Sequence, residues 1–191
     1  MAQEARLEEM SSGLAPVSDG WFVVNVGEAA WLRNDAFGGR CVFESSPRVL
    51  GDRPDLEPRM FDGVGFTLAV LEPGKPSGLY HGESNQEDFL VLAGTCLLLV
   101  EGEERRLQAW DFVHCPAGTG HVFVGSGAGP CVIFMTGARS RDKTIVYPRS
   151  ELARAYRAGV ETETYSPAKA YAAFPRWESG RPDTWACLPW S

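Results

Sequence analysis

Histidine is scarce in this sequence, with three in 191 residues. No apolar run approaches the ~20 residues that a membrane-spanning helix needs. The chain also has no glycine-rich phosphate-binding loop, no G-x-S-x-G sequence, no Rossmann fingerprint and no candidate helix-turn-helix. These absences exclude the common signatures of nucleotide-binding proteins, serine hydrolases and DNA-binding proteins. Any chemistry must therefore come from another arrangement of side chains.

Basic residues are outnumbered by acidic ones, 18 to 25, which gives a formal net charge of −7. That balance disfavours nucleic acid and anionic membrane surfaces as partners. The five cysteines are scattered, odd in number and without a C-x-x-C pair, which is typical of a reduced, cytoplasmic protein. The first ten residues are acidic and lack the apolar segment of a secretory signal. We therefore expect a cytoplasmic protein whose partner is a small molecule.

Short apolar and β-branched segments, separated by turns that contain glycine or proline, dominate the centre of the chain. This spacing predicts an all-β sandwich or barrel. The strands predicted there are residues 65–71, 79–83, 88–93, 96–100, 104–109, 112–115, 121–124 and 131–136. Two further strands are predicted upstream, at residues 21–26 and 40–44, from their β-branched and aromatic side chains.

The two ends of the chain differ from its centre. We divide the sequence into a flexible N-terminal tail (1–19), a β-barrel (20–138) and a C-terminal helical and irregular extension that packs on the barrel (139–191). The tail is predicted because no strand pattern is present there. Two short helices are predicted in the extension, each after a serine suited to cap a helix N-terminus, Ser150 and Ser166.

Four residues with metal-binding side chains are spaced so that they can converge. His81 and Glu83 are two residues apart in a predicted strand, so their side chains share one face. Glu87 follows after three polar residues, a loop short enough to bring the next strand alongside, and His121 begins a later strand. A single histidine in an apolar strand is more often a hydrogen-bonded core residue than a metal ligand. The four residues together favour a metal site.

Glu83 has three open interpretations: a metal ligand, a solvent-facing carboxylate at the mouth, or a general base beside a three-ligand site. Two imidazoles with one or two carboxylates suit Fe(II) or Mn(II), and nickel and zinc remain alternatives. We expect one divalent transition metal per chain. Phe89, Val91 and Phe123 have the same parity as the ligands along their strands, so we expect them to line the cavity.

Around these residues the sequence resembles the cupin superfamily. The residues that match the first cupin motif are Gly74, His81, Glu83, Glu87 and Gly94. Those at the positions of the second motif are Trp110, Pro116, Gly118, His121 and Gly125. In the first motif one extra residue precedes the histidine, and Glu83 stands where a second histidine is usual. In the second, Trp110 replaces a glycine and Gly125 an asparagine. The resemblance covers roughly residues 64 to 136.

The resemblance implies a double-stranded β-helix (jelly-roll) barrel, here with short C-terminal helices, and a site inside the mouth of the barrel. It also implies a metal-binding protein that acts on a small molecule, with dioxygenase chemistry first and isomerase or decarboxylase chemistry next. The alternative is a non-catalytic module that binds a metabolite or sugar. Cupins often lend an N-terminal strand to a neighbour, and the apolar residues 21–26 would suit that role, so we expect a homodimer.

Overall fold

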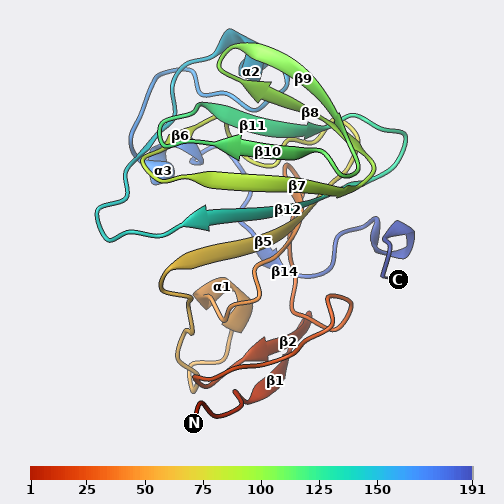
Figure 1. Ribbon diagram of the computed structural model, residues 1–191, viewed down its shortest axis with the longest axis vertical. Coiled ribbons are helices and arrows are strands. Elements are labelled where there is room, and N and C mark those ends of the chain that lie inside the picture. The colour runs from red at the N-terminus through yellow and green to blue at the C-terminus, as the bar shows by residue number, and fades with distance from the viewer. Residues whose placement is uncertain (191) are drawn as a thin grey trace.

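The computed structural model describes residues 1–190, which are mainly antiparallel β-strands (Figure 1). The largest sheet runs in the order β10 (Phe112–Cys115), β7 (Glu87–Ala93), β12 (Cys131–Ala138), β5 (Val64–Leu71), β4 (Gly38–Cys41), β3 (Leu32–Asn34) and β14 (Glu178–Ser179). A second sheet has the order β11 (His121–Gly125), β8 (Thr95–Val100) and β9 (Glu103–Gln108). The strands expected downstream of residue 64 are therefore confirmed, although the one predicted at 79–83 is reduced to two residues.

Two small sheets and four short helices complete the fold. The small sheets pair β1 (Leu7–Met10) with β2 (Gly13–Pro16), and β6 (Gly82–Glu83) with β13 (Ile145–Val146). The helices are α1 (Pro47–Leu50), α2 (Glu151–Ala155), α3 (Pro167–Ala170) and a 3-10 helix at Trp185–Cys187. The Ser150 and Ser166 side chains accept hydrogen bonds from backbone N–H groups three residues on, so both predicted caps are confirmed. Within residues 1–190, no helix has the length and apolarity to cross a membrane.

The main core lies between the seven-stranded and three-stranded sheets. Val91 on β7, Leu71 on β5 and Ile133 on β12 are completely buried there, with Phe89 and Phe123 beside them. Alternate residues of each strand point into this space, because successive side chains of a strand lie on opposite faces. Burial of each large apolar side chain contributes about 1.5–3 kcal/mol relative to exposure. The core therefore holds the strands that carry the candidate ligands in fixed positions.

The outer face of the large sheet is covered by segments from both ends of the chain. Leu68 and Val70 on β5 pack in one cluster with Trp31, which is completely buried. The rings of Trp185 and Trp190 lie 5.4 and 5.6 Å from the ring of Trp31. The C-terminal segment also adds β14 to the edge of the sheet and β13 beside β6. Residues after 138 are thus integrated into the sheets as well as packed against them.

The expectation of a flexible N-terminal tail over residues 1–19 is wrong. Residues 7–16 form the β1–β2 hairpin, which lies at the bottom of Figure 1. Met10, Ala15 and Val17 are buried against Leu32 and Leu50. Each strand has only four residues and few inward side chains, so the sequence carries too little alternation to reveal it.

The predicted strand at residues 21–26 is also corrected. It forms only an isolated bridge between Trp21 and Glu4 and belongs to none of the described sheets. Trp21 and Val23 are exposed, while Val24 and Val26 pack against the cluster around Trp31. The segment is therefore apolar on both sides but buried on only one.

Candidate metal centre

The backbones around His81 and His121 are paired with each other. The His81 N–H donates to the His121 carbonyl over 3.2 Å, and the His121 N–H donates to the His81 carbonyl over 2.9 Å. Their ring centroids are 5.1 Å apart. Beside them Gly82 lets the Gly118 backbone come close, because a Cβ atom on Gly82 would lie 3.0 Å from the Gly118 carbonyl oxygen. The antiparallel bridge thus places two imidazoles side by side.

Each imidazole is oriented by a backbone carbonyl. His81 Nδ1 lies 2.7 Å from the Leu79 oxygen, and His121 Nδ1 lies 3.0 Å from the Thr119 oxygen. A carbonyl oxygen only accepts hydrogen bonds, so both Nδ1 atoms carry the hydrogen. In the neutral rings the Nε2 atoms then present lone pairs. This is the usual arrangement of a metal-binding histidine, in which the second nitrogen donates to a backbone or carboxylate partner.

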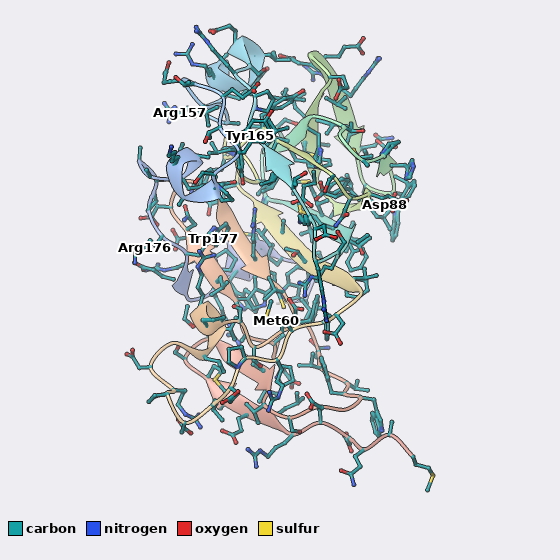
Figure 2. The ribbon with its side chains drawn as sticks, turned by 90° about the vertical axis from the view of Figure 1, so that its left-hand side faces the viewer. Met60, Asp88, Arg157, Tyr165, Arg176 and Trp177 are labelled. Carbon is teal, nitrogen blue, oxygen red and sulfur yellow. The ribbon has the colours of Figure 1, made fainter. Side chains whose placement is uncertain are left out.

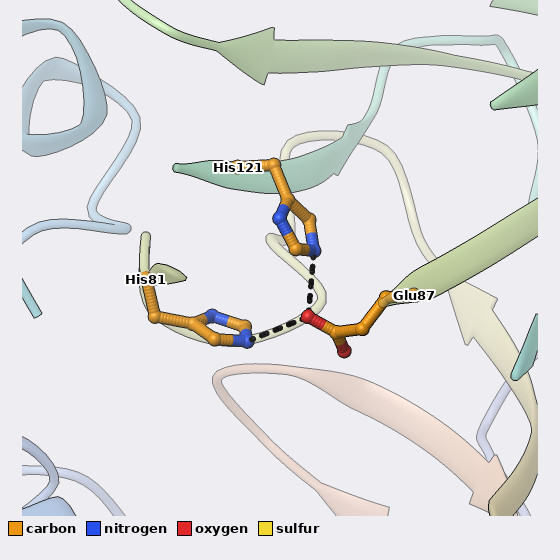
Figure 3. Close-up of side chains that lie close together, drawn as sticks. All are labelled: His81, Glu87 and His121. Carbon is orange, nitrogen blue, oxygen red and sulfur yellow. Dashed lines mark ion pairs between the residues drawn. The ribbon is translucent and has the colours of Figure 1, made fainter. Parts of the chain in front are cut away.

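Glu87, the first residue of β7, directs its carboxylate toward these lone pairs (Figure 3). Its Oε2 atom is 3.6 Å from His121 Nε2 and 3.9 Å from His81 Nε2. One ligand atom from each of the three residues lies within 4.8 Å of the others. With both histidines neutral and Glu87 ionised, three electron-pair donors face one another with no hydrogen between them, an arrangement that a shared cation would stabilise. The donor set fits a divalent transition metal.

Burial controls the charge of these groups. Removal from water raises the pKa of Glu87 to about 7, and the nearby Glu83 charge adds to the effect. Burial likewise lowers the pKa of His81 to about 3, with a further contribution from His121. The pKa of His121 is also lowered, mainly by burial. Each shift disfavours the charged form of the side chain, and a bound cation would offset that cost for the carboxylate.

Glu83 lies beside this group without joining it. One carboxylate oxygen is 3.9 Å from His81 Nε2, and the other forms an ion pair with the Lys143 ammonium. Glu83 is 9% exposed, so a solvent-facing role at the mouth does not fit. An ionised Glu87 adds negative charge beside the Glu83–Lys143 ion pair, which leaves room for a metal charge. No sequence motif pointed to Lys143, which follows β12 in an irregular segment.

A cavity of about 1050 Å³ extends from the three ligands. Phe89 and Phe123 line it, as expected, and their rings are 4.7 Å apart. Val91 does not line it, because it lies farther along β7 and is completely buried in the core. Tyr147 forms another part of the wall, with its ring 5.8 Å from that of His81. Tyr147 follows the strand-rich region, and no pattern in the sequence predicted that it would line the cavity.

The remaining histidine lies outside the site. His114 is exposed on β10, and its Nδ1 atom is 2.6 Å from the Asp88 carboxylate. The neighbouring Cys115 is 2% exposed and belongs to the core. Alternation along the strand therefore separates these two side chains.

Comparisons with known proteins add to this geometry. Residues 67–137 match the family model described as a cupin domain. No curated protein sequence matches the chain. Among solved structures, a sugar phosphate isomerase from Silicibacter pomeroyi DSS-3 is 22% identical, with a TM-score of 0.50, and the match covers 65% of this chain and 80% of that one. At that identity the likeness shows the fold alone.

Two further solved structures are more distant in shape. The polyketide cyclase RemF from Streptomyces resistomycificus is 16% identical over 64% of this chain and 82% of its own, with a TM-score of 0.49. A protein from Acidithiobacillus ferrooxidans ATCC 23270 is 26% identical over 58% of this chain, with a TM-score of 0.45. The match covers 66% of that protein, just under two thirds of its length.

Proposed function

Because the chain belongs to the cupin superfamily, we propose that it is a metal-dependent enzyme that acts on a small organic molecule in the cavity beside His81, Glu87 and His121. The observation that carries this proposal is the convergence of three ligand atoms within 4.8 Å, with both imidazoles oriented by backbone carbonyls. When bound, a divalent ion with three protein ligands has positions open for substrate and dioxygen, and it polarises the substrate oxygens that it binds.

The first candidate reaction is that of a dioxygenase. Two histidines and one carboxylate are the ligand set of many non-haem iron oxygenases, which supports iron as the metal. Manganese is the next choice for the same ligands, and nickel and zinc are alternatives. Phe89 and Phe123 would exclude water from one side of the bound substrate, since both are almost completely buried and line the cavity.

The second candidate is an isomerase or decarboxylase, and the Glu83–Lys143 ion pair favours it. In this reaction a Glu83 oxygen would accept a proton from the substrate, and the ion pair with the Lys143 ammonium would hold the carboxylate in position. The position of Glu83 supports the role, because its other oxygen is 3.9 Å from His81 Nε2 at the edge of the metal centre. The alternative role for the same carboxylate is that of a fourth metal ligand, which would replace its ion pair with Lys143.

Two matched substitutions separate a ligand from a base. Glu87→Gln should abolish metal binding, because the amide is a far weaker ligand than the carboxylate. Glu83→Gln should leave metal content unchanged and lower proton-transfer turnover by roughly 10²–10⁴-fold. Elemental analysis of both purified variants measures their metal content. Loss of metal from Glu83→Gln as complete as that from Glu87→Gln would mean that Glu83 is a ligand.

Turnover separates the enzyme from its rival, a non-catalytic module that holds a metabolite or sugar. The metal-loaded protein would be incubated with catechols, enediols and small hydroxy acids, with and without dioxygen. Oxygen-dependent product supports the dioxygenase, and oxygen-independent product supports the isomerase or decarboxylase. Tight binding of a panel member without product under either condition would support the binding module.

Three broader features are also proposed. The two facing sheets are proposed to be a double-stranded β-helix, on the strength of the cupin family match. The protein is proposed to be cytoplasmic, because its scattered cysteines form no disulfide in the described residues. A homodimer is proposed from the exposed apolar side chains of Trp21 and Val23. Light scattering that gives the monomer mass of 20.9 kDa would contradict the dimer.

A further inference from the structure

The cavity beside the metal centre is lined by an unusual number of cations. These are Arg40, Arg48, Arg139, Lys143 and Arg176. Two of them have carboxylate partners, since Arg139 pairs with Glu44 and Lys143 with Glu83. Among residues 1–190, no carboxylate forms an ion pair with any of the other three. The cavity therefore carries positive charge that the described protein does not neutralise.

Arg40 differs from the other two unpaired arginines because it is withdrawn from water. Arg48 and Arg176 are exposed, whereas the Nε atom of Arg40 is buried and has no hydrogen-bond partner in the described chain. Its Nη2 atom donates to the Ser77 carbonyl oxygen, and its guanidinium stacks on the Trp177 ring at 4.5 Å. These contacts fix the plane of the guanidinium and leave part of its donor capacity unused.

Trp177 and Arg176 come from the segment that precedes β14. Figure 2 labels Arg176 at the left-hand edge of the molecule and Trp177 closer to its middle. Trp177 is half-buried, so its ring forms a platform on one face of the Arg40 guanidinium. Burial lowers the pKa of Arg40, as expected of a cation without a carboxylate beside it. A buried cation is costly without an anionic partner.

The path from Arg40 to the metal centre is lined by aromatic rings. A Cβ atom built on Gly78 would lie 3.4 Å from Arg40 Nη2 and 3.0 Å from the Tyr171 hydroxyl, so these two polar groups flank one position. The Tyr171 ring is 5.8 Å from that of Tyr147, which in turn is 5.8 Å from that of His81. Two ring-to-ring steps therefore connect His81 with Tyr171, whose hydroxyl flanks the same position as Arg40.

We propose that the cavity takes an organic anion whose carboxylate or phosphate group pairs with Arg40, while oxygens at its other end reach the metal centre. This inference deepens the proposed function and rests on it for the metal-binding end of the molecule. The planar fork of arginine matches the paired oxygens of both anions, which explains the choice of a guanidinium at this position. The substrate must be longer than acetate to touch both ends.

Matched pairs of ligands test the distal anion. For the carboxylate, 2-hydroxyglutarate is compared with 2-hydroxypentanoate, which has the same metal-binding end and a methyl group in place of the distal carboxylate. For the phosphate, 3-phosphoglycerate is compared with glycerate. In the metal-loaded wild-type protein, calorimetry should show that, in one of the two pairs, the compound with the distal anion binds about ten- to a hundredfold more tightly than the compound without it. The pair with the larger ratio identifies the anion.

Arg40→Met should reduce that ratio to about one while leaving metal content unchanged. Arg106→Met, which removes the same charge from the exposed face of β9, should keep the ratio. If Arg40→Met does not fold, Arg40→Lys keeps the charge without the fork and should reduce the ratio severalfold. A wild-type ratio near one for both pairs, or a ratio that Arg40→Met and Arg40→Lys leave intact, would overturn the proposal.

A measurement on metal-free protein keeps the two proposals apart. Inorganic phosphate or propionate should bind the metal-free wild-type protein about tenfold more tightly than the metal-free Arg40→Met protein. That difference depends on Arg40 alone, so it persists even if the chain binds no metal. Equal binding of both anions by the two proteins would overturn the anion site and leave the metal centre unaffected.

Discussion

Removal of one partner of the ion pair between Arg139 and Glu44 should be among the most destabilising single changes in this fold. Glu44 follows β4, and its side chain is 2% exposed. Its two oxygens accept hydrogen bonds from Arg139 over 2.6 and 2.8 Å, and one of them also accepts from the Phe61 N–H over 2.5 Å. Arg139 itself, which follows β12 and lines the cavity, also donates to the Phe61 carbonyl. The pair therefore ties three separate segments together.

Arg139→Met removes the cation and leaves the carboxylate buried. Loss of one partner from a buried pair costs about 3–5 kcal/mol, because the remaining charge has lost its compensation. Glu44 keeps the hydrogen bond from Phe61, so we expect a loss near the lower end, about 3 kcal/mol. For a chain of this length that corresponds to a decrease in Tm of about 6–12 °C.

Urea denaturation and thermal melts of the metal-free protein would measure the effect. The double variant Arg139→Met/Glu44→Gln removes both charges and keeps an acceptor for the Phe61 N–H. It should recover at least half of the lost free energy of unfolding. A loss below about 1 kcal/mol in Arg139→Met, or a double variant as unstable as the single one, would refute this reasoning.

Substitutions at three other positions test local features of the fold, each by urea denaturation. Trp110→Gly should stabilise the protein by about 1 kcal/mol, because Trp110 is 74% exposed and has a φ of 77°, which favours glycine. An unchanged free energy of unfolding would mean that the backbone at Trp110 is not strained. Gly94→Ala should cost at least about 2 kcal/mol, since φ is 73° and the new Cβ would lie 2.5 Å from the Pro130 oxygen; a neutral result would count against this. Ser150→Ala should cost about 1 kcal/mol through loss of the cap, and Ser150→Asp should retain stability.

Strand periodicity, together with the cupin resemblance, pointed to a set of four candidate ligands, three of which converge, while the fourth, Glu83, lies beside them. His81, Glu87 and His121 converge because short strands fix which side chains share a face, and hydrogen-bonded pairing then brings those faces together. The same reasoning placed Phe89 and Phe123 at the cavity correctly, but it also placed Val91 there, which is buried in the core instead. It depends only on local alternation, which the sequence displays directly.

Features that depend on contacts between distant segments were not predictable in this way. The partner of Glu83 is Lys143, which belongs to an irregular segment with no periodicity. The cavity wall around Arg40 and Trp177 joins β4 to the segment that precedes β14. The β1–β2 hairpin was missed because it is short and derives its stability from burial against residues such as Leu50. Tertiary packing decides such elements more than local propensity does.

The metal content of the purified protein tests the central claim most directly. Wild-type protein prepared without added metal or chelator should contain about one transition-metal ion per chain by elemental analysis. His121→Ala should lose that ion and keep its β-sheet circular dichroism spectrum, while His114→Ala, which changes the histidine outside the site, should keep the ion. Equal metal content in His121→Ala and wild type would contradict the account, and so would a wild-type protein that stays metal-free after incubation with iron, manganese, nickel and zinc.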